Sequence, residues 1–132
     1  MLRGGCFCGA VRYETTGQPY HRTVCHCSIC RRTTGAPFVA WFSVPRAAFR
    51  FVRGTPATLR SSPQATRSFC ARCGTQLSFA DDAAPAEIDI TTCSLDDPGQ
   101  APPEDHTHTA SRLAWTALAD GLPTHRAARP GP

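Results

Sequence analysis

The sequence contains no lysine and no long apolar segment, and each absence narrows the kinds of protein to consider. All fourteen basic residues are arginine, so the formal charge of +4 at pH 7 depends on arginine alone. No run of about 18 or more apolar residues is present, which argues against a helix that spans a membrane. The first residues, 1–5, contain no apolar core of a signal peptide. We therefore expect a cytoplasmic protein.

Internal repeats and long linkers are also missing. The 132 residues fit one domain of ordinary size. Twelve prolines and ten glycines divide the chain into short pieces. We expect a single domain over residues 1–123, followed by a basic, proline-rich tail over residues 124–132 that frays.

Apolar and polar residues alternate in several of these pieces, which predicts a mainly β fold built from short strands. The expected strands are residues 10–14, 37–44, 49–52, 66–69, 75–79 and 87–91. A single stretch has the spacing of a helix, because Leu113 and Ala117 lie four residues apart. Ser111 can cap its start and Gly121 can stop it. We therefore expect one short C-terminal helix over residues 111–119.

Cysteine, in contrast, is abundant, and its spacing is the most informative feature of the chain. Seven of the eight cysteines fall into three tight clusters: Cys6-Phe7-Cys8, Cys25-His26-Cys27-Ser28-Ile29-Cys30 and Cys70-Ala71-Arg72-Cys73. Disulfides usually join distant parts of secreted chains, whereas clustered thiolates suit a shared metal ion. The spacing therefore favours Zn²⁺ over disulfides.

Seven cysteines cannot complete two tetrahedral zinc sites, which need eight ligands. Cys25, Cys27 and Cys30 are close enough in sequence to occupy three corners around one ion. The pairs Cys6/Cys8 and Cys70/Cys73 would then form a site of four thiolates that closes a long loop. Spacing alone leaves open another grouping, in which Cys6/Cys8 joins Cys25/Cys27.

The incomplete site would keep a position for water or substrate, as a catalytic zinc does. His106 or His108 could fill that corner instead, although ordinary histidines without a metal are the simpler interpretation. We expect the side chain of His26 to point away from the metal, and lone Cys93 to be a small buried side chain rather than a ligand. In the competing interpretation, both zinc ions are purely structural.

Metal binding also changes the meaning of the positive charge. Seven thiolates and two Zn²⁺ ions would lower the formal charge from +4 to about +1, and several arginines adjoin the cysteine clusters. These arginines offset thiolate charge, so we expect no nucleic-acid partner.

The three cysteine clusters with their neighbours resemble the glutathione-dependent formaldehyde-activating (GFA) family. The resemblance extends over about residues 4–123 and is carried by three motifs: Gly4-Gly5-Cys6-Phe7-Cys8-Gly9-Ala10-Val11-Arg12-Tyr13, Cys25 to Arg32 with Gly35-Ala36-Pro37-Phe38, and Phe69 to Leu77. It implies an Mss4-like fold of small antiparallel sheets. It also implies a structural zinc on Cys6, Cys8, Cys70 and Cys73 and a catalytic zinc on Cys25, Cys27 and Cys30.

The activity that the resemblance implies is carbon–sulfur lyase chemistry on S-(hydroxymethyl)glutathione, the adduct of formaldehyde and glutathione. Such a substrate carries two carboxylates, and Arg31 and Arg32 directly follow the three-cysteine motif. We expect one or both to bind a carboxylate. His26 is a weak candidate for moving the proton of the hydroxymethyl group. The alternative is a non-catalytic zinc module that binds another protein.

Overall fold

The computed structural model describes residues 1–131 of the 132-residue chain. This part of the protein is mainly β, as expected, and contains one α-helix. The strands are β1 (Leu2–Gly5), β2 (Arg12–Thr15), β3 (Tyr20–Cys25), β4 (Val39–Pro45), β5 (Phe49–Arg53), β6 (Ala57–Ser62), β7 (Ala65–Phe69), β8 (Gln76–Asp81), β9 (Glu87–Thr91) and β10 (Asp105–Thr107), and the helix is α1 (Ser28–Thr34).

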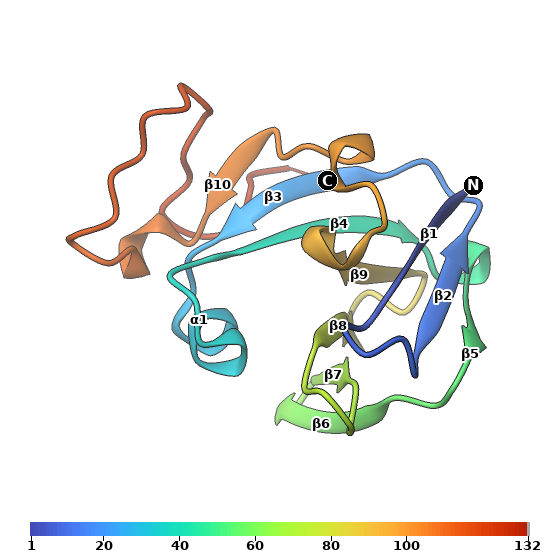
Figure 1. Ribbon diagram of the computed structural model, residues 1–132. Helices are drawn as coiled ribbons and strands as arrows, with labels where there is room; N and C mark the ends of the chain where they lie inside the picture. The colour runs from blue at the N-terminus through green and yellow to red at the C-terminus, as the bar shows by residue number, and fades with distance from the viewer. Residues whose placement is uncertain (132) are drawn as a thin grey trace.

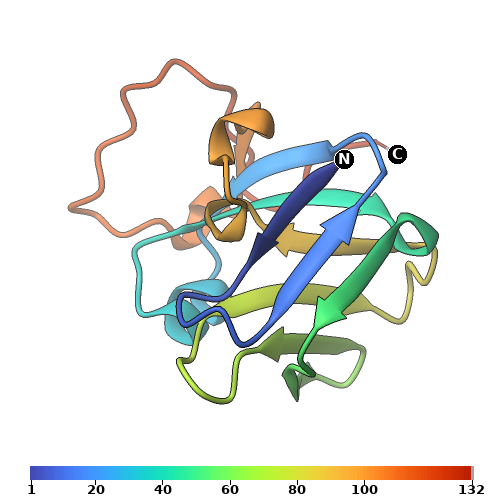
Figure 2. The same ribbon diagram turned by 45° about the vertical axis from the view of Figure 1, so that its right-hand side comes forward.

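The strands form two sheets that pack face to face. The smaller sheet has the order β1-β2-β5 and the larger has the order β10-β3-β4-β9-β8-β7-β6. Every pairing between named strands is antiparallel except that of β10 with β3. Figure 2 shows β1 and β2 lying across one face of the larger sheet. Helix α1 connects β3 to β4 at one end of the molecule (Figure 1).

The core lies between the two sheets because alternate residues of each strand point to the same face. Phe42 and Val44 of β4 and Ile88 and Ile90 of β9 are buried there against Tyr13 of β2. Adjacent core strands thus contribute bulky apolar side chains to one shared layer. This packing leaves the opposite face of β4 and β9 free to carry other side chains.

That opposite face carries polar and aromatic residues. The strand registers place Ser43 opposite Asp89, Asp89 opposite Phe79, and Phe79 opposite Arg67. Residues directly opposite each other on neighbouring strands share a face. One row of side chains therefore crosses β4, β9, β8 and β7.

The expected strands all correspond to strands of the structure, and no end differs by more than two residues. The strands missed were β1, β3, β6 and β10. The helix expected over residues 111–119 was wrong. A single 3₁₀ turn (Thr109–Ser111) begins there, and the following segment is irregular, with Trp115 73% exposed.

The tail that was expected to fray makes hydrogen bonds and an ion pair in the part that the structure describes. The backbone N–H of His106 donates to the carbonyl of Pro123, and the N–H of His125 donates back to the carbonyl of His106, both at 2.8 Å. Arg129 pairs with Asp105 at 2.6 Å. Residues 124–129 therefore run along β10, while Pro132 lies outside the described residues.

Residues 1–131 contain no helix that is both long and apolar enough to cross a membrane.

Candidate metal centres and the cavity beside them

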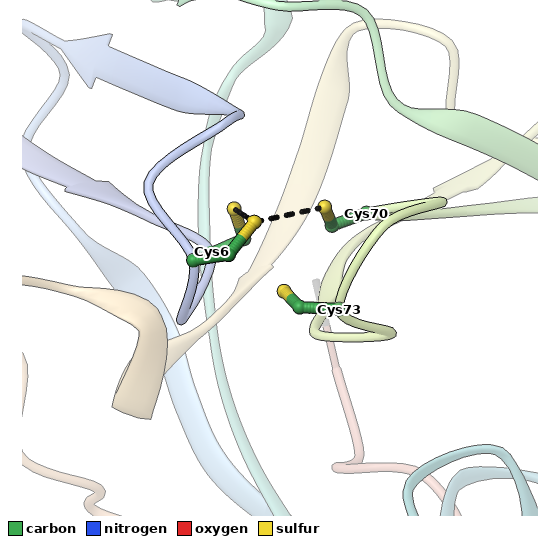
Figure 3. A group of neighbouring side chains, drawn as sticks. Cys6, Cys70 and Cys73 are labelled. Carbon is green, nitrogen blue, oxygen red and sulfur yellow. Dashed lines mark hydrogen bonds between the residues drawn. The ribbon is translucent and has the colours of Figure 1, made fainter.

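The four-cysteine cluster forms where two turns meet. Cys6 and Cys8 lie in the turn between β1 and β2, and Cys70 and Cys73 lie in the turn between β7 and β8. The four sulfur atoms lie within 4.8 Å of one another. Figure 3 shows Cys70 and Cys73 facing Cys6 across the gap between the turns. The pairs of cysteines expected to converge thus come together.

The sulfur–sulfur distances in this cluster fit a tetrahedral zinc site. Cys6 Sγ lies 3.6 Å from Cys8 Sγ, and Cys8 Sγ lies 3.7 Å from Cys70 Sγ. A tetrahedron with Zn–S distances of about 2.3 Å has edges of about 3.8 Å. All eight cysteines are free thiols. The donor set and its spacing therefore fit a bound Zn²⁺.

Both turns of this cluster depend on a glycine in the left-handed region. Gly9 follows Cys8 with φ of 80°, and Gly74 follows Cys73 with φ of 84°. A side chain at either position is unfavourable in this backbone conformation. Each chain segment can therefore bend back directly after its second cysteine.

Thr75 connects the two turns of the four-cysteine cluster. Its hydroxyl accepts a hydrogen bond from the backbone N–H of Phe7 at 3.0 Å and lies 3.3 Å from Cys73 Sγ. The hydrogen bonds from the Thr75 side chain and backbone lower the pKa of Cys73 to about 5. Hydrogen bonds of this kind stabilise a thiolate, the form that binds a metal.

The three-cysteine cluster is built from one short segment. Cys25 ends β3, Cys27 is the N-cap of α1, and Cys30 lies in the first turn of α1. The three sulfur atoms lie within 4.8 Å of one another. The sulfur of Cys27 accepts a hydrogen bond from the backbone N–H of Cys30 at 3.2 Å. One thiol thus both caps the helix and belongs to the cluster.

The pKa values of the cysteines in this cluster are shifted in opposite directions. Hydrogen bonds from Cys25 and Cys30 lower the pKa of Cys27 to about 2. The same hydrogen bond to Cys27 raises the pKa of Cys25. Cys27 is therefore the thiolate that the protein environment favours most, even before a cation is considered.

A cavity of about 340 Å³ opens beside the three-cysteine cluster. All three cysteines line it, together with Trp41 and Phe79. Its other walls consist of His21, Thr23, Ser43, Arg67, Glu87, Asp89, Thr107, His108, Ala128, Arg129 and Gly131. The described end of the tail thus contributes to the wall of this cavity.

Two histidines in the cavity wall hold an uncommon backbone conformation. His21 has φ of 46° and His108 has φ of 55°. Both line the cavity, and they are the non-glycine residues with positive φ within residues 1–131. Positive φ is uncommon for residues other than glycine, and strained backbone of this kind occurs at active sites and ligand clamps.

A buried arginine adjoins the three-cysteine cluster. Arg67 of β7 is only 3% exposed, and its Nη2 lies 3.6 Å from Cys30 Sγ. Its Nε donates to Ser61 Oγ at 3.1 Å, while Nη1 is buried without a partner. The guanidinium carbon lies 5.0 Å from the ring centre of Phe79 and 5.8 Å from that of Trp41. The cluster thus has a fixed cation against it.

The arginines expected to bind substrate lie elsewhere. Arg31 and Arg32 belong to α1 and are not among the residues that line the cavity. Arg67 and Arg129 line it instead. Sequence reasoning missed Arg67 because it is 37 residues from Cys30. Only the strand register brings it to the cluster.

His26 and His106 form a buried pair outside both cysteine clusters. His26 Nε2 lies 2.9 Å from His106 Nδ1, and His106 Nε2 lies 2.8 Å from Asp120 Oδ2. Neither imidazole lines the cavity. His106 on β10 thus contacts His26, which lies between β3 and α1. It also contacts Asp120 in the irregular segment near residue 120.

His108 lines the cavity, but no histidine or carboxylate among residues 1–131 joins the three sulfur atoms as a fourth close ligand. Cys93 was expected to be buried and is exposed instead, and it lies outside both clusters. It lies in a 3₁₀ turn (Thr92–Ser94) in which only Thr92 is buried. The three-cysteine cluster therefore consists of three sulfur atoms beside a cavity.

Comparison with known proteins agrees with this arrangement. A family model described as glutathione-dependent formaldehyde-activating enzyme matches residues 1–111. The chain belongs to the glutathione-dependent formaldehyde-activating enzyme family. The family match includes every cysteine of both clusters, whereas the tail over residues 124–132 lies beyond it.

Relatives of this GFA family chain are known from several organisms. A Halomonas elongata protein named "Putative glutathione-dependent formaldehyde-activating enzyme" is 33% identical over 128 residues, which cover 89% of this chain and 81% of that protein. An uncharacterized lyase of Schizosaccharomyces pombe is 34% identical over 77 residues, 58% of this chain and 56% of that protein. Relatives of the GFA chain are thus named as enzymes.

The fold also has a counterpart among solved structures. The crystal structure of a Rhodobacter sphaeroides protein matches with a TM-score of 0.62 at 22% identity. The match covers 93% of this chain and 98% of the other. The GFA chain therefore shares its fold with that protein.

Proposed function

We propose that this protein is a zinc-dependent carbon–sulfur lyase that acts on the adduct of an aldehyde and a glutathione-type thiol, such as S-(hydroxymethyl)glutathione. The observation that carries the proposal is the three-cysteine cluster, which borders a cavity and has no fourth protein ligand among residues 1–131. Family membership and the names of relatives point to the same substrate class.

Each cluster would hold one Zn²⁺ in this proposal. Cys6, Cys8, Cys70 and Cys73 supply a complete set of four ligands, which suits a structural ion. Cys25, Cys27 and Cys30 supply three ligands, which suits an ion that also accepts a substrate atom. When bound at the second centre, zinc would favour the thiolate form of a thiol at neutral pH.

The reaction requires that the negative charge on the departing sulfur be stabilised. In adduct cleavage, the carbon–sulfur bond breaks and sulfur keeps the electron pair. The hydroxyl group loses its proton to water as the C=O bond of the aldehyde forms, so the products are an aldehyde, a thiolate and a proton. Arg67 lies beside Cys30 and partly offsets the negative charge of three cysteine thiolates. Trp41 and Phe79 give the cavity an apolar side. The reverse reaction uses the same contacts.

A site-directed experiment tests this proposal. Exchange between formaldehyde and its glutathione adduct is followed by NMR with zinc-loaded wild type, Cys27→Ser and the control Cys93→Ser. We expect acceleration over the uncatalysed exchange by the wild type and by Cys93→Ser. The acceleration should fall by about 100-fold or more in Cys27→Ser, because the second metal centre is lost.

Identical exchange rates with wild type, with Cys27→Ser and without protein would contradict the lyase. The chain would then be a zinc-binding module with two structural ions. The expected cytoplasmic location stays a prediction, as does the absence of a nucleic-acid partner.

A further inference from the structure

The cavity beside the three-cysteine cluster separates charges of opposite sign. Arg67 lies at the end that touches the cysteines, whereas Glu87 and Asp89 line the cavity from β9. Asp89 and Arg67 stand in the same row, with Phe79 between them on β8. Two strand spacings separate their backbones, which is about 10 Å. A ligand that spans the cavity can therefore reach both.

Asp89 is a carboxylate with an open position. Its Oδ1 accepts a hydrogen bond from the Ser43 hydroxyl at 2.6 Å, and within residues 1–131 it has no ion pair. Burial and the nearby negative charge of Glu87 raise its pKa to about 6. Asp81 adds to this effect and His21 opposes it. Asp89 is thus ionised at neutral pH yet lacks a cation.

Glu87 extends the acidic end of the cavity. Its Oε2 accepts a hydrogen bond from the Tyr20 hydroxyl at 2.9 Å and lies 4.0 Å from His21 Nδ1. Glu87, Asp89 and Phe79 also line a smaller adjoining cavity of about 120 Å³. The acidic wall therefore faces space rather than packed side chains.

A metal ion is not the cation that these carboxylates fit. Glu87 and Asp89 belong to no group of three close ligand atoms within the described chain, so the protein builds no coordination cage around them. An ammonium group needs only two or three acceptors. The wall therefore suits an organic cation.

Arg67 provides the independent observation for an anion. It is buried, lines the cavity, and keeps one guanidinium nitrogen, Nη1, without a hydrogen-bond partner. An unpaired buried donor is unfavourable unless a partner satisfies it. Arginine binds carboxylates with two parallel hydrogen bonds. Its free nitrogen therefore suits a carboxylate near the cysteines.

We propose that this cavity is a binding subsite for a zwitterionic, peptide-like thiol, in which Asp89, assisted by Glu87, binds the ammonium group and Arg67 binds a carboxylate. The proposal rests on the proposed function, because the substrate sulfur has to lie beside Cys25, Cys27 and Cys30. The separation of Asp89 from Arg67 favours a ligand whose two charges lie on different residues. A simple thiol without an ammonium group would leave Asp89 unpaired.

Binding of unreactive thioethers to the zinc-loaded protein tests the ammonium half of the proposal. S-methylglutathione and its N-acetylated form, which lacks the ammonium group, are titrated calorimetrically into wild type, Asp89→Asn and the control Asp82→Asn. Asp82 is exposed and pairs with Arg60 outside the cavity. We expect Asp89→Asn to weaken S-methylglutathione binding by about 10-fold to 100-fold. The N-acetylated ligand should bind weakly and equally to all three proteins.

The carboxylate half is tested with Arg67→Lys, which keeps a positive charge beside Cys30 but removes the second guanidinium nitrogen. The matched control is Arg60→Lys on the neighbouring strand β6. We expect Arg67→Lys to weaken S-methylglutathione about 10-fold, and to leave unchanged the weak binding of the analogue with its glycine carboxylate amidated. Retained zinc stoichiometry and circular dichroism exclude a folding defect.

The proposal would be overturned if each variant lost affinity for the modified and the unmodified ligands by the same factor. The substitutions would then act through a change in structure and not through the charged group of the ligand. Absence of S-methylglutathione binding to the wild type would also overturn it. The two proposals fail in different ways. A protein that discriminates the ligands but does not accelerate adduct exchange retains the subsite and loses the lyase activity, whereas catalysis without discrimination removes only the subsite.

Discussion

The two cysteine clusters use the same ligand in very different surroundings. The four-cysteine cluster joins two turns, and Cys8 lies 62 residues from Cys70 in sequence. The three-cysteine cluster occupies six consecutive residues and borders a cavity with a buried arginine. The first cluster therefore brings distant parts of the fold together, whereas the second borders a cavity that a ligand could enter.

The two cysteine clusters differ in their surroundings as well as in their number of cysteines. What distinguishes the second centre is the cavity, together with the charges of Arg67 and Asp89. Each of the four following predictions substitutes one residue in or near one of the two clusters.

Loss of a ligand from the four-cysteine cluster should have the largest effect on stability. In Cys70→Ser, the turn between β7 and β8 loses its metal link to the N-terminal turn. Binding of a structural zinc contributes several kcal/mol to folding, so we expect the variant to be largely unfolded or to lose at least about 4 kcal/mol. Chemical denaturation and zinc analysis measure this change. Cys93→Ser, which removes an exposed thiol, should match the wild type.

The corresponding change in the three-cysteine cluster should affect stability less. Cys27→Ser removes one metal ligand, but a serine can still cap α1. We expect a loss of about 1–2 kcal/mol, with one zinc retained per chain. The same denaturation experiment measures it. A loss as large as that of Cys70→Ser would mean that both centres hold the fold together equally.

Asp89→Asn should stabilise the protein above pH 6. Because burial and Glu87 raise the pKa of Asp89 to about 6, the fold favours its protonated form. That stabilisation is complete below the unfolded-state pKa of about 4 and is lost as the pH rises through about 6. Asparagine cannot ionise and can still accept the Ser43 hydrogen bond. We expect a gain of about 1–3 kcal/mol at pH 8 and none at pH 4, measured by urea denaturation.

A contrary result would be informative for this position. Equal stability of wild type and Asp89→Asn at both pH values would mean that solvent or a bound cation already relieves the buried charge. The matched variant Asp82→Asn, on the exposed surface, should show no gain at pH 8.

The smallest effect is expected at the exposed pair beside the four-cysteine cluster. Arg12 Nη1 and Nη2 contact the two carboxylate oxygens of Asp96 at 2.9 and 2.6 Å. The Arg12 side chain is 32% exposed and that of Asp96 is 54% exposed. Exposed pairs contribute at most about 1 kcal/mol, so Asp96→Asn should cost about 0.5 kcal/mol. Thermal unfolding at low and high salt checks this value, and a cost above 2 kcal/mol would contradict it.

Much of the fold could be predicted because its strands alternate apolar and polar residues. Strand β9 shows this alternation, because it buries Ile88 and Ile90 and turns Glu87 and Asp89 toward the cavity. Strand β4 is buried on both faces and was predicted from its aromatic and β-branched residues instead. Strand β1 was missed because two of its four residues are glycine. The short β10 was missed because its pairing with β3 and the tail involves only three residues, all buried.

The helix was placed in the wrong segment for a specific reason. The apolar residues at 113–118 have helical spacing, but the exposure of Trp115 shows that no core lies against them. Spacing without a partner surface is a weak signal. The true helix, α1, contains seven residues and is capped by the Cys27 sulfur. Its sequence was interpreted only as a metal motif.

The clusters were predictable from sequence, whereas the residues around them were not. Close spacing brings Cys25, Cys27 and Cys30 together without long-range information. Arg67 and Asp89 reach the cavity only through the register of β7, β8 and β9. Strand register depends on packing of the whole sheet, which local patterns do not encode.

The sequence separation within each cluster also has a consequence for the order of folding. Cys25, Cys27 and Cys30 are so close in the chain that they can capture a metal ion while the rest is still unfolded, since closing so short a loop is fast. Cys8 and Cys70 can meet only after a loop of more than sixty residues has closed. The centre proposed for catalysis can therefore be the first to acquire its ion, and the centre that holds the fold together the last.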